Sequence, residues 1–249
     1  MESVGRSVTG MLREKNEDNI FISSKGKLNL YIVADGMGGH NAGEVASSFS
    51  IEMFNEYFDK AFKDGINEDN ALDTMVEAIS FCNRELYLKS LSKKEYSGMG
   101  TTFLATLIIG KKLYIVHVGD SRLYIFSKGE LKQLTSDHSF VMEMVRKGKI
   151  TKKEAKRHPQ RNVITRAVGS EENVDIDTIM ADIYINDIIL ICSDGLTNMV
   201  TDDKIKETLE KDITIEEKVT ELIDIANENG GKDNISIIIV KADGLGVEE

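Results

Sequence analysis

Five aspartates are spread along this chain, and each lies in a tight polar or glycine-rich turn beside an apolar run. Four of these turns adjoin runs that are typical of β-strands, at 30–34, 113–118, 188–192 and 235–240. Carboxylates placed alike at strand ends can converge in space, and a cluster of unpaired carboxylates repels itself unless cations offset the charge. The pattern therefore predicts a metal site. The five residues are Asp18, Asp35, Asp120, Asp194 and Asp233.

The chain shows no proline-, serine- or glycine-rich linker and no internal repeat, so we expect residues 1–249 to form one domain. Asp and Glu together number 42 and Lys and Arg 31, which gives a net charge of −11. A protein that binds nucleic acid or an anionic membrane would be expected to carry a basic face, so this balance argues against both partners. Bound cations would offset part of the acidic excess.

Two cysteines, Cys82 and Cys192, lie inside apolar runs, and neither has a partner at metal-binding spacing. Because no signal peptide is apparent, two buried thiols fit a reducing compartment, and we expect a cytoplasmic protein. No stretch approaches the roughly 18 consecutive apolar residues of a transmembrane helix, so no membrane span is expected. Nothing in the sequence indicates more than a monomer.

The apolar patterns predict strands that come in consecutive pairs joined by short turns. Because the paired strands are consecutive, antiparallel pairing is favoured over a parallel βαβ sheet. We therefore expect an α+β fold in which two antiparallel sheets pack together with helices outside. Strands are expected at 19–23, 30–34, 102–109, 112–118, 122–126, 130–134, 174–180, 187–192 and 235–240, with a turn at 24–26. Helices are expected at about 41–62, 69–91 and 214–229, and residues 139–163 form a helical, basic segment.

The segment Asp35-Gly36-Met37-Gly38-Gly39 carries the clearest chemical signal. A strand ends in a carboxylate, and the glycines that follow allow the backbone to pass close to a bound group. The Gly36 carbonyl oxygen could also face a hard cation, and such all-oxygen ligands suit Mg²⁺ or Mn²⁺ better than Zn²⁺. Taken alone, the segment fits a tight turn that caps the following helix better than it fits a metal site. Asp120 has the weakest individual case, because its turn also fits a plain hairpin.

Together these motifs resemble the protein phosphatase 2C family of metal-dependent Ser/Thr phosphatases, in its compact bacterial form. The resemblance runs from about Arg13 to Val240, and the order of its eight pieces makes it specific. The pieces are Arg13-Glu14-Lys15-Asn16-Glu17-Asp18, Asp35-Gly36-Met37-Gly38-Gly39-His40, Gly98-Met99-Gly100-Thr101-Thr102, Val118-Gly119-Asp120-Ser121-Arg122, Leu134-Thr135-Ser136-Asp137-His138-Ser139, Ile164-Thr165-Arg166-Ala167-Val168-Gly169, Ser193-Asp194-Gly195-Leu196 and Gly231-Lys232-Asp233-Asn234.

The resemblance implies a β-sandwich of two antiparallel sheets flanked by pairs of helices, with two Mn²⁺ or Mg²⁺ ions in a cleft at one end. By the family pattern, Asp35 bridges the ions, Gly36 offers its carbonyl oxygen, and Asp194 and Asp233 bind one ion. Asp18, with Glu17 as a less certain helper, holds the other ion directly or through water. Bacterial members often carry a third, weaker ion, for which Asp120 with Asp194 would be the ligands.

The same resemblance implies hydrolysis of phosphoserine and phosphothreonine in proteins, by a hydroxide that bridges the ions. Arg13 would grip the phosphate, since its planar guanidinium pairs with two phosphate oxygens. His40 is the candidate general acid, with metal-bound water as its competitor. Many eukaryotic members place a histidine where this chain has Met37, which puts the identity of the acid in doubt. His138 is interpreted as structural. The partners implied are phosphorylated proteins, including a Ser/Thr protein kinase.

Residues 139–163 correspond to the variable flap of the family. They hold eight basic and two acidic residues, an excess of six positive charges on an acidic chain. We expect this flap either to steer acidic phosphoprotein segments into the cleft or to be a plain solvated helical face.

Three alternatives remain at this stage. A catalytically silent pseudophosphatase would share the fold, although such proteins lose metal carboxylates and all five are present here. A two-metal nuclease or another phosphoesterase is disfavoured by the acidic net charge. A phospho-acceptor receiver domain also clusters aspartates, but it needs a parallel βαβ rhythm that this chain lacks.

Overall fold

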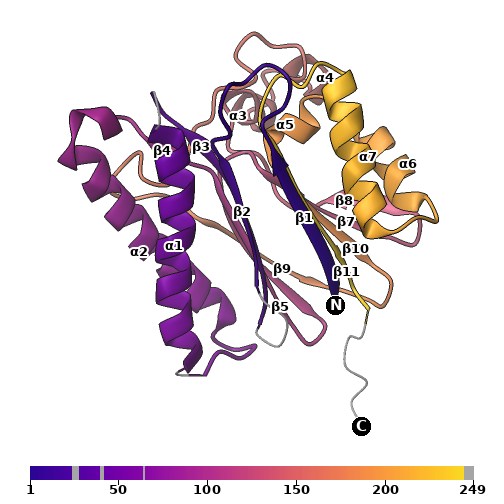
Figure 1. The fold of residues 1–249 in the computed structure, drawn as a ribbon, viewed down its shortest axis with the longest axis horizontal. Helices are drawn as coiled ribbons and strands as arrows, with labels where there is room; N and C mark the ends of the chain where they lie inside the picture. The colour runs from indigo at the N-terminus through magenta and orange to yellow at the C-terminus, as the bar shows by residue number, and fades with distance from the viewer. Residues whose placement is uncertain (24–27, 40–41, 64, 244–249) are drawn as a thin grey trace.

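The computed structural model describes residues 1–23, 28–39, 42–63 and 65–243. Two β-sheets pack face to face, and helices cover the outer face of each sheet (Figure 1). Every strand pairing within the sheets is antiparallel. The arrangement confirms the expected α+β sandwich flanked by helices.

Within the described residues, one sheet has five strands in the order β1-β11-β10-β7-β8 and the other has six. The five are β1 (Glu2–Val8), β11 (Ile235–Lys241), β10 (Ile188–Cys192), β7 (Arg122–Ser127) and β8 (Glu130–Gln133). The second sheet has the order β2-β3-β5-β6-β9, with the short β4 paired to the end of β3. Its strands are β2 (Asp18–Ile22), β3 (Asn29–Met37), β4 (Gly100–Thr101), β5 (Phe103–Ile109), β6 (Lys112–Val118) and β9 (Asp177–Asp182).

A pair of helices lies on the outer face of each sheet (Figure 1). Helices α1 (Ala42–Lys63) and α2 (Ala71–Ser92) cover the six-stranded sheet, and α6 (Asp202–Glu210) and α7 (Ile215–Glu228) cover the five-stranded one. The shorter elements lie in connections. They are η1 (Lys94–Tyr96), α3 (Phe140–Arg146), α4 (Lys152–Ala155) and α5 (Asp194–Thr197).

The four layers enclose three apolar cores. One core lies between the sheets and includes Val33, Leu104 and Ile189. A second lies between the six-stranded sheet and α1 with α2, and the third between the five-stranded sheet and α6 with α7. Because the central strands face a core on both sides, they do not alternate: β10 is apolar throughout, and β5 is apolar except at the buried Thr106.

Local sequence signals set several element boundaries. The face of α2 that carries Met75, Ile79 and Leu86 is fully buried, as its helical spacing predicts. The side chain of Thr214 accepts a hydrogen bond from the Glu217 amide while the Glu217 carboxylate accepts one from the Thr214 amide, so the predicted capping box starts α7. An equivalent box starts α4.

Some expectations were incomplete. Strand β1 and helix α6 were not expected, and β9 begins at Asp177 rather than at residue 174. The residues of β1 are mostly polar or small, and the strand is recruited by pairing with β11 from the far end of the chain. The expected turn at 24–26 lies outside the described residues. Within the described parts of the chain, no helix is both long and apolar enough to cross a membrane.

The flap leaves and rejoins the sandwich at one point. An isolated bridge joins Ser139 to Ile164, and the two short helices α3 and α4 lie between these residues. The hydroxyl of Ser139 caps α3 by accepting a hydrogen bond from the Met142 amide. The expected helical segment at 139–163 is therefore confirmed.

Candidate metal and phosphate site

The strand ends of both sheets meet at one end of the sandwich and bring the five aspartates into one region. Asp18 and Asp35 are direct partners in the register of β2 and β3. Asp194 follows β10, and the amide of the preceding Ser193 donates to the Ser236 carbonyl, so the ends of β10 and β11 lie side by side. A cavity of about 280 Å³ opens here, and its lining includes Arg13, Glu17, Asp35, Gly36, Asp120, Asp194 and Asp233.

Asp18 is buried, and its two carboxylate oxygens differ in their hydrogen bonding. The hydroxyls of Ser193 and Ser236 each donate to Oδ2 at 2.7 Å, whereas Oδ1 is buried and has no hydrogen-bond partner among the described residues. Burial raises the pKa of Asp18 to about 6. A buried carboxylate oxygen without a partner is costly, so this atom calls for a ligand that the chain itself does not provide.

The pKa values of the neighbouring carboxylates are raised as well. Desolvation raises the pKa of Asp35 well above its usual value, and the charges of Asp18 and Asp194 raise it further. Desolvation also raises the pKa of Asp194, followed by the charges of Asp120 and Asp233. For Asp120 burial is again the main cause and raises the pKa to about 7. Mutual repulsion of this kind is relieved by divalent cations.

The donor set fits a hard divalent cation. It consists of carboxylates and a backbone carbonyl, which are the ligands that Mg²⁺ and Mn²⁺ prefer. In the described residues, however, no group of three or more His, Cys, Asp or Glu side chains is already arranged to hold a metal ion. Several of these oxygens are engaged by protein donors instead, and Asn198 Nδ2 donates to Asp194 Oδ2 at 2.8 Å. Metal binding would therefore require the carboxylates to exchange these partners.

Two glycines allow the backbone to pack closely at this site. A Cβ atom added to Gly36 would lie 2.1 Å from the Gly43 carbonyl oxygen, so any side chain would push β3 away from the start of α1. A Cβ on Gly195 would lie 1.9 Å from the Asn234 carbonyl oxygen. Glycine at position 36 therefore lets the segment that carries Asp35 lie against the start of α1, and glycine at position 195 lets the segments that carry Asp194 and Asp233 approach each other.

Arg13 lies at the rim of the cavity, with its side chain half exposed. Its Nη2 donates to Asp233 Oδ2 at 2.8 Å. The nearby carboxylates of Asp233, Glu17 and Asp35 raise the pKa of Arg13 against the lowering effect of desolvation, which is the largest single influence. A guanidinium held at the edge of a carboxylate cluster is placed to meet an anion that enters the cavity.

Asn234 holds the loop that carries Arg13, a role that the sequence reasoning missed. Its Nδ2 donates to the carbonyl oxygens of Thr9 and Lys15, at 3.0 and 2.8 Å, and its Oδ1 accepts from the Glu17 amide at 2.8 Å. The only signal in the sequence is that this asparagine directly follows Asp233. One amide thus joins the N-terminal loop to the turn before β11.

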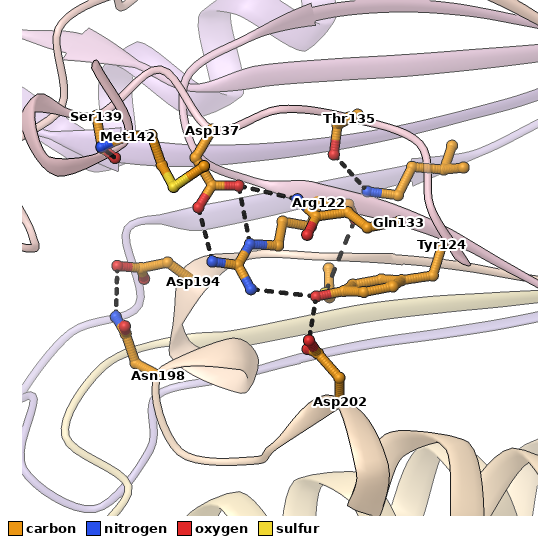
Figure 2. A network of polar contacts seen from close by, with 12 residues as sticks. Arg122, Tyr124, Gln133, Thr135, Asp137, Ser139, Met142, Asp194, Asn198 and Asp202 are labelled. Atoms are coloured by element: carbon orange, nitrogen blue, oxygen red, sulfur yellow. Dashed lines mark hydrogen bonds and ion pairs between the residues drawn. The ribbon is translucent and has the colours of Figure 1, made fainter. Parts of the chain in front are cut away.

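A second polar network adjoins Asp120, and Figure 2 shows its members. Arg122 donates from Nε and Nη2 to the two oxygens of Asp137, at 2.9 and 2.6 Å. Its Nη1 donates to the Tyr124 hydroxyl at 3.1 Å, and that hydroxyl donates to Asp202 at 3.2 Å. The forked ion pair fixes the wall of a larger cavity of about 670 Å³, which shares Asp120 and Asp194 with the metal cavity.

His138 holds the turn before Asp120, as the sequence interpretation expected. The Gly119 amide donates to His138 Nδ1 at 3.0 Å, and the His138 amide donates to the Gly119 carbonyl at 2.8 Å. On its other side, His138 Nε2 lies 3.1 Å from Asp177 Oδ2. These contacts give His138 a structural role in orienting the turn that ends in Asp120.

Comparison with known proteins decides the family. The model of the family described as Protein phosphatase 2C matches residues 13–238. The serine/threonine phosphatase stp of Listeria monocytogenes serotype 4b is 39% identical over 252 residues, which cover 98% of this chain and 96% of that protein. The chain belongs to the protein phosphatase 2C family.

Solved structures agree with this assignment. The serine/threonine phosphatase Stp1 from Staphylococcus aureus is 38% identical with a TM-score of 0.91, and the match covers 98% of this chain and 95% of that one. The catalytic domain of the serine threonine protein phosphatase PstP, in complex with two manganese ions, is 34% identical with a TM-score of 0.84 over 96% of this chain and 97% of that one.

Membership of the protein phosphatase 2C family confirms the predicted resemblance and makes the chain a metal-dependent protein serine/threonine phosphatase. Nothing in the comparisons favours the pseudophosphatase alternative, and the receiver and nuclease alternatives are wrong. The structure brings Arg13, Asp35, Gly36, Asp120, Asp194 and Asp233 to one cavity, with Asp18 buried beside it. His40 lies outside the described residues, so its role as general acid stays a prediction.

Proposed function

We propose that this phosphatase hydrolyses phosphoserine and phosphothreonine in proteins with two Mn²⁺ or Mg²⁺ ions held by Asp18, Asp35, the Gly36 carbonyl, Asp194 and Asp233. The observation that carries this proposal is the buried Asp18 Oδ1, which has no hydrogen-bond partner among the described residues. Once bound, such ions make a nucleophile from water available near neutral pH and neutralise charge on the phosphoryl oxygens.

Arg13 would orient the phosphate at the mouth of the cavity. Its guanidinium now shares a hydrogen bond with Asp233, and an incoming phosphate offers the same kind of charged oxygen in a forked geometry. Because the side chain is half exposed, it can turn between these two partners without unfolding the loop. A phosphate held in this way would be oriented at the mouth of the cavity.

A third, weaker ion would use Asp120 with Asp194. Both residues line the metal cavity and the larger cavity beside it, so an ion there would lie where the two cavities meet. His138 and the Arg122–Asp137 pair hold the surrounding backbone, which gives Asp120 a defined position.

The lining of the larger cavity favours acidic phosphoprotein segments as substrates. Four cationic side chains of the flap line it, and none of them forms an ion pair with a described residue. They are Lys152, Lys153, Lys156 and Arg161. Unpaired cations beside a phosphate-binding site favour substrates with carboxylates near the phosphorylated residue. A Ser/Thr protein kinase would phosphorylate such substrates and could itself be a substrate of the phosphatase. We propose that the phosphatase acts on them as a cytoplasmic monomer.

Calorimetric titration with Mn²⁺ tests the metal assignment. We expect the wild type to bind at least two ions and Asp18→Asn to bind at least one of them more weakly. Equal binding by both proteins would contradict the role of Asp18. A variant with Lys152, Lys153 and Lys156 changed to glutamine tests the flap, by comparing acidic with neutral phosphopeptides at low and high salt. Equal losses on both peptides would remove the flap proposal and leave the metal site untouched.

A further inference from the structure

Two serine hydroxyls of one sheet converge on a single carboxylate oxygen of the other sheet. Ser193 and Ser236 are both fully buried, and each donates to Asp18 Oδ2 at 2.7 Å. Asp18 begins β2 of the six-stranded sheet, whereas Ser236 lies in β11 of the five-stranded sheet and Ser193 directly follows β10. The two hydrogen bonds therefore tie this carboxylate to the sheet opposite its own.

The number of protons fixes the direction of these hydrogen bonds. A serine hydroxyl has one proton, and an ionised carboxylate can only accept. The Ser236 amide donates to Ser193 Oγ at 3.0 Å, so the Ser193 hydroxyl keeps its proton for Asp18. Ser7 Oγ lies 2.8 Å from Ser236 Oγ, and because Asp18 already uses the Ser236 proton, Ser7 is the donor in this contact.

The hydrogen bonds form a closed ring that begins and ends at Asp18. Asn16 Nδ2 donates to Ser7 Oγ at 2.7 Å, and Asn16 Oδ1 accepts from the Asp18 amide at 3.2 Å. Ser7 and Ser236 are direct partners in the register of β1 and β11, which places their hydroxyls side by side. The ring directs its last proton to Asp18 Oδ2 and none to Oδ1, which has no hydrogen-bond partner among the described residues.

The carboxylate that is held in this way neighbours the metal cavity. Asp18 and Asp35 are opposite each other in the register of β2 and β3, so their side chains leave the same face of the sheet with Cβ atoms about 4.5–5.5 Å apart. Asp35 lines the cavity. The Asp18 carboxylate cannot turn without breaking two charge-assisted hydrogen bonds, so the orientation of its free oxygen is fixed from the opposite sheet.

We propose that Ser193 and Ser236 are positioning residues, which hold Asp18 Oδ2 so that Oδ1 stays available to a divalent cation or to a water molecule bound to that cation. This role rests on the proposed function, in which Asp18 helps to hold the metal ions. Groups that orient a metal ligand without touching the ion commonly change metal affinity 10- to 100-fold when they are removed.

A double-mutant cycle on Mn²⁺ affinity tests the positioning role. Calorimetric titration with Mn²⁺ compares the wild type with Ser236→Ala, Asp18→Asn and the double variant. We expect Ser236→Ala to weaken the binding of at least one ion about tenfold. The affinities of the double variant should match those of Asp18→Asn within about twofold for every ion that still binds, because the serine acts through the carboxylate. The same cycle with Ser193→Ala should give the same result, and it carries the test if Ser236→Ala does not fold.

Two further variants separate positioning from the general loss of a buried hydroxyl. Ser50→Ala is the matched control, because it removes an equally buried hydroxyl, which donates to the Ala46 carbonyl within α1. It should leave every Mn²⁺ affinity unchanged. Ser7→Ala leaves both donors to Asp18 Oδ2 in place, so it should cost less Mn²⁺ affinity than Ser236→Ala does. Thermal melting of each chelator-treated variant shows that it is folded before the titration.

Several results would overturn the positioning role. They are wild-type Mn²⁺ affinity in both serine variants, a serine-to-alanine loss that is as large in the Asp18→Asn background as in the wild type, and an equal loss in Ser50→Ala. Failure of the proposed function has a different signature. In that case the wild type would bind no Mn²⁺, or Asp18→Asn would bind every ion as tightly as the wild type.

Discussion

Replacing Asp120 by asparagine should stabilise the metal-free protein. Asp120 is buried, with 9% of its surface exposed, and burial together with the charge of Asp137 raises its pKa from 3.8 to about 7. Because the pKa of Asp120 is higher in the folded than in the unfolded protein, the folded state binds the proton more tightly. The stability that this proton contributes is fully present below the unfolded pKa and is lost as the pH rises through the folded pKa. Above pH 7 the ionised Asp120 therefore works against the folded state, and a neutral asparagine does not.

The size of the effect follows from the pKa. A change from 3.8 to about 7 corresponds to an upper limit of about 4 kcal/mol at pH 8, since each pKa unit is about 1.4 kcal/mol. The advantage of Asp120→Asn grows between about pH 4 and pH 7, so roughly 2 kcal/mol of it should disappear when the pH falls from 8 to 5.5. The titration of His117 and His138 affects both proteins alike and cancels in the difference.

The assay is urea unfolding after treatment with a chelator, at pH 8 and at pH 5.5, with the melting temperature as a second measure. For a chain of this size, 1 kcal/mol shifts the melting temperature by about 2–4 °C. Asp59→Asn, which removes an exposed carboxylate from α1, is the control and should change little. Added Mn²⁺ should stabilise the wild type more than Asp120→Asn. The reasoning is wrong if the variant is no more stable than the wild type at pH 8 without metal, or if its advantage does not shrink at pH 5.5.

Three other predictions follow from local geometry. Gly195→Ala should cost about 2–3 kcal/mol of stability in urea unfolding and weaken Mn²⁺ binding, because the new methyl group would lie 1.9 Å from the Asn234 carbonyl oxygen. Thr214→Ala removes the cap of α7 and should cost about 1 kcal/mol, seen as a lower melting temperature. Cys82 and Cys192 are buried and burial raises the pKa of each thiol to about 12, so Ellman's reagent at pH 8 should react with neither until the protein unfolds.

Each of these has its own control. Gly39→Ala places a methyl group where, its chain neighbours aside, no atom of the described residues lies within 4 Å, so it should be tolerated. An equal loss in both glycine variants would argue against a steric cause. An unchanged melting temperature for Thr214→Ala would show that the capping box adds nothing. Rapid labelling of the native thiols would contradict their burial.

The parts of the fold that the sequence predicts well are those decided by local chemistry. The hairpin of β5 and β6 follows from two apolar runs separated by Gly110, which has a positive φ of 56°. The start of α7 follows from the hydrogen-bonding groups of Thr214 and Glu217. In both cases the residues that determine the structure are a few positions apart, so the pattern can be seen along the chain.

The missed parts depend on partners far away in the sequence. Strand β1 has no strong apolar pattern, and it forms because its backbone pairs with β11. Arg122 and Asp137 each occur in a recognisable motif, but neither motif says that the two side chains form a forked ion pair. The loop contacts of Asn234 likewise join the two ends of the chain. The candidate metal ligands could be predicted because each stands at a strand end, whereas the groups that hold them in place could not.

The most direct test of the account is hydrolysis of a phosphothreonine peptide by chelator-treated enzyme, with and without added Mn²⁺, comparing wild type with Asp35→Asn. Asp35 lies among the other carboxylates, and their charges add to desolvation in raising its pKa. We predict that the wild type is active only with metal and that Asp35→Asn stays at the metal-free background under both conditions. Activity of the wild type without any divalent ion, or full Mn²⁺-dependent activity in Asp35→Asn, would contradict the account.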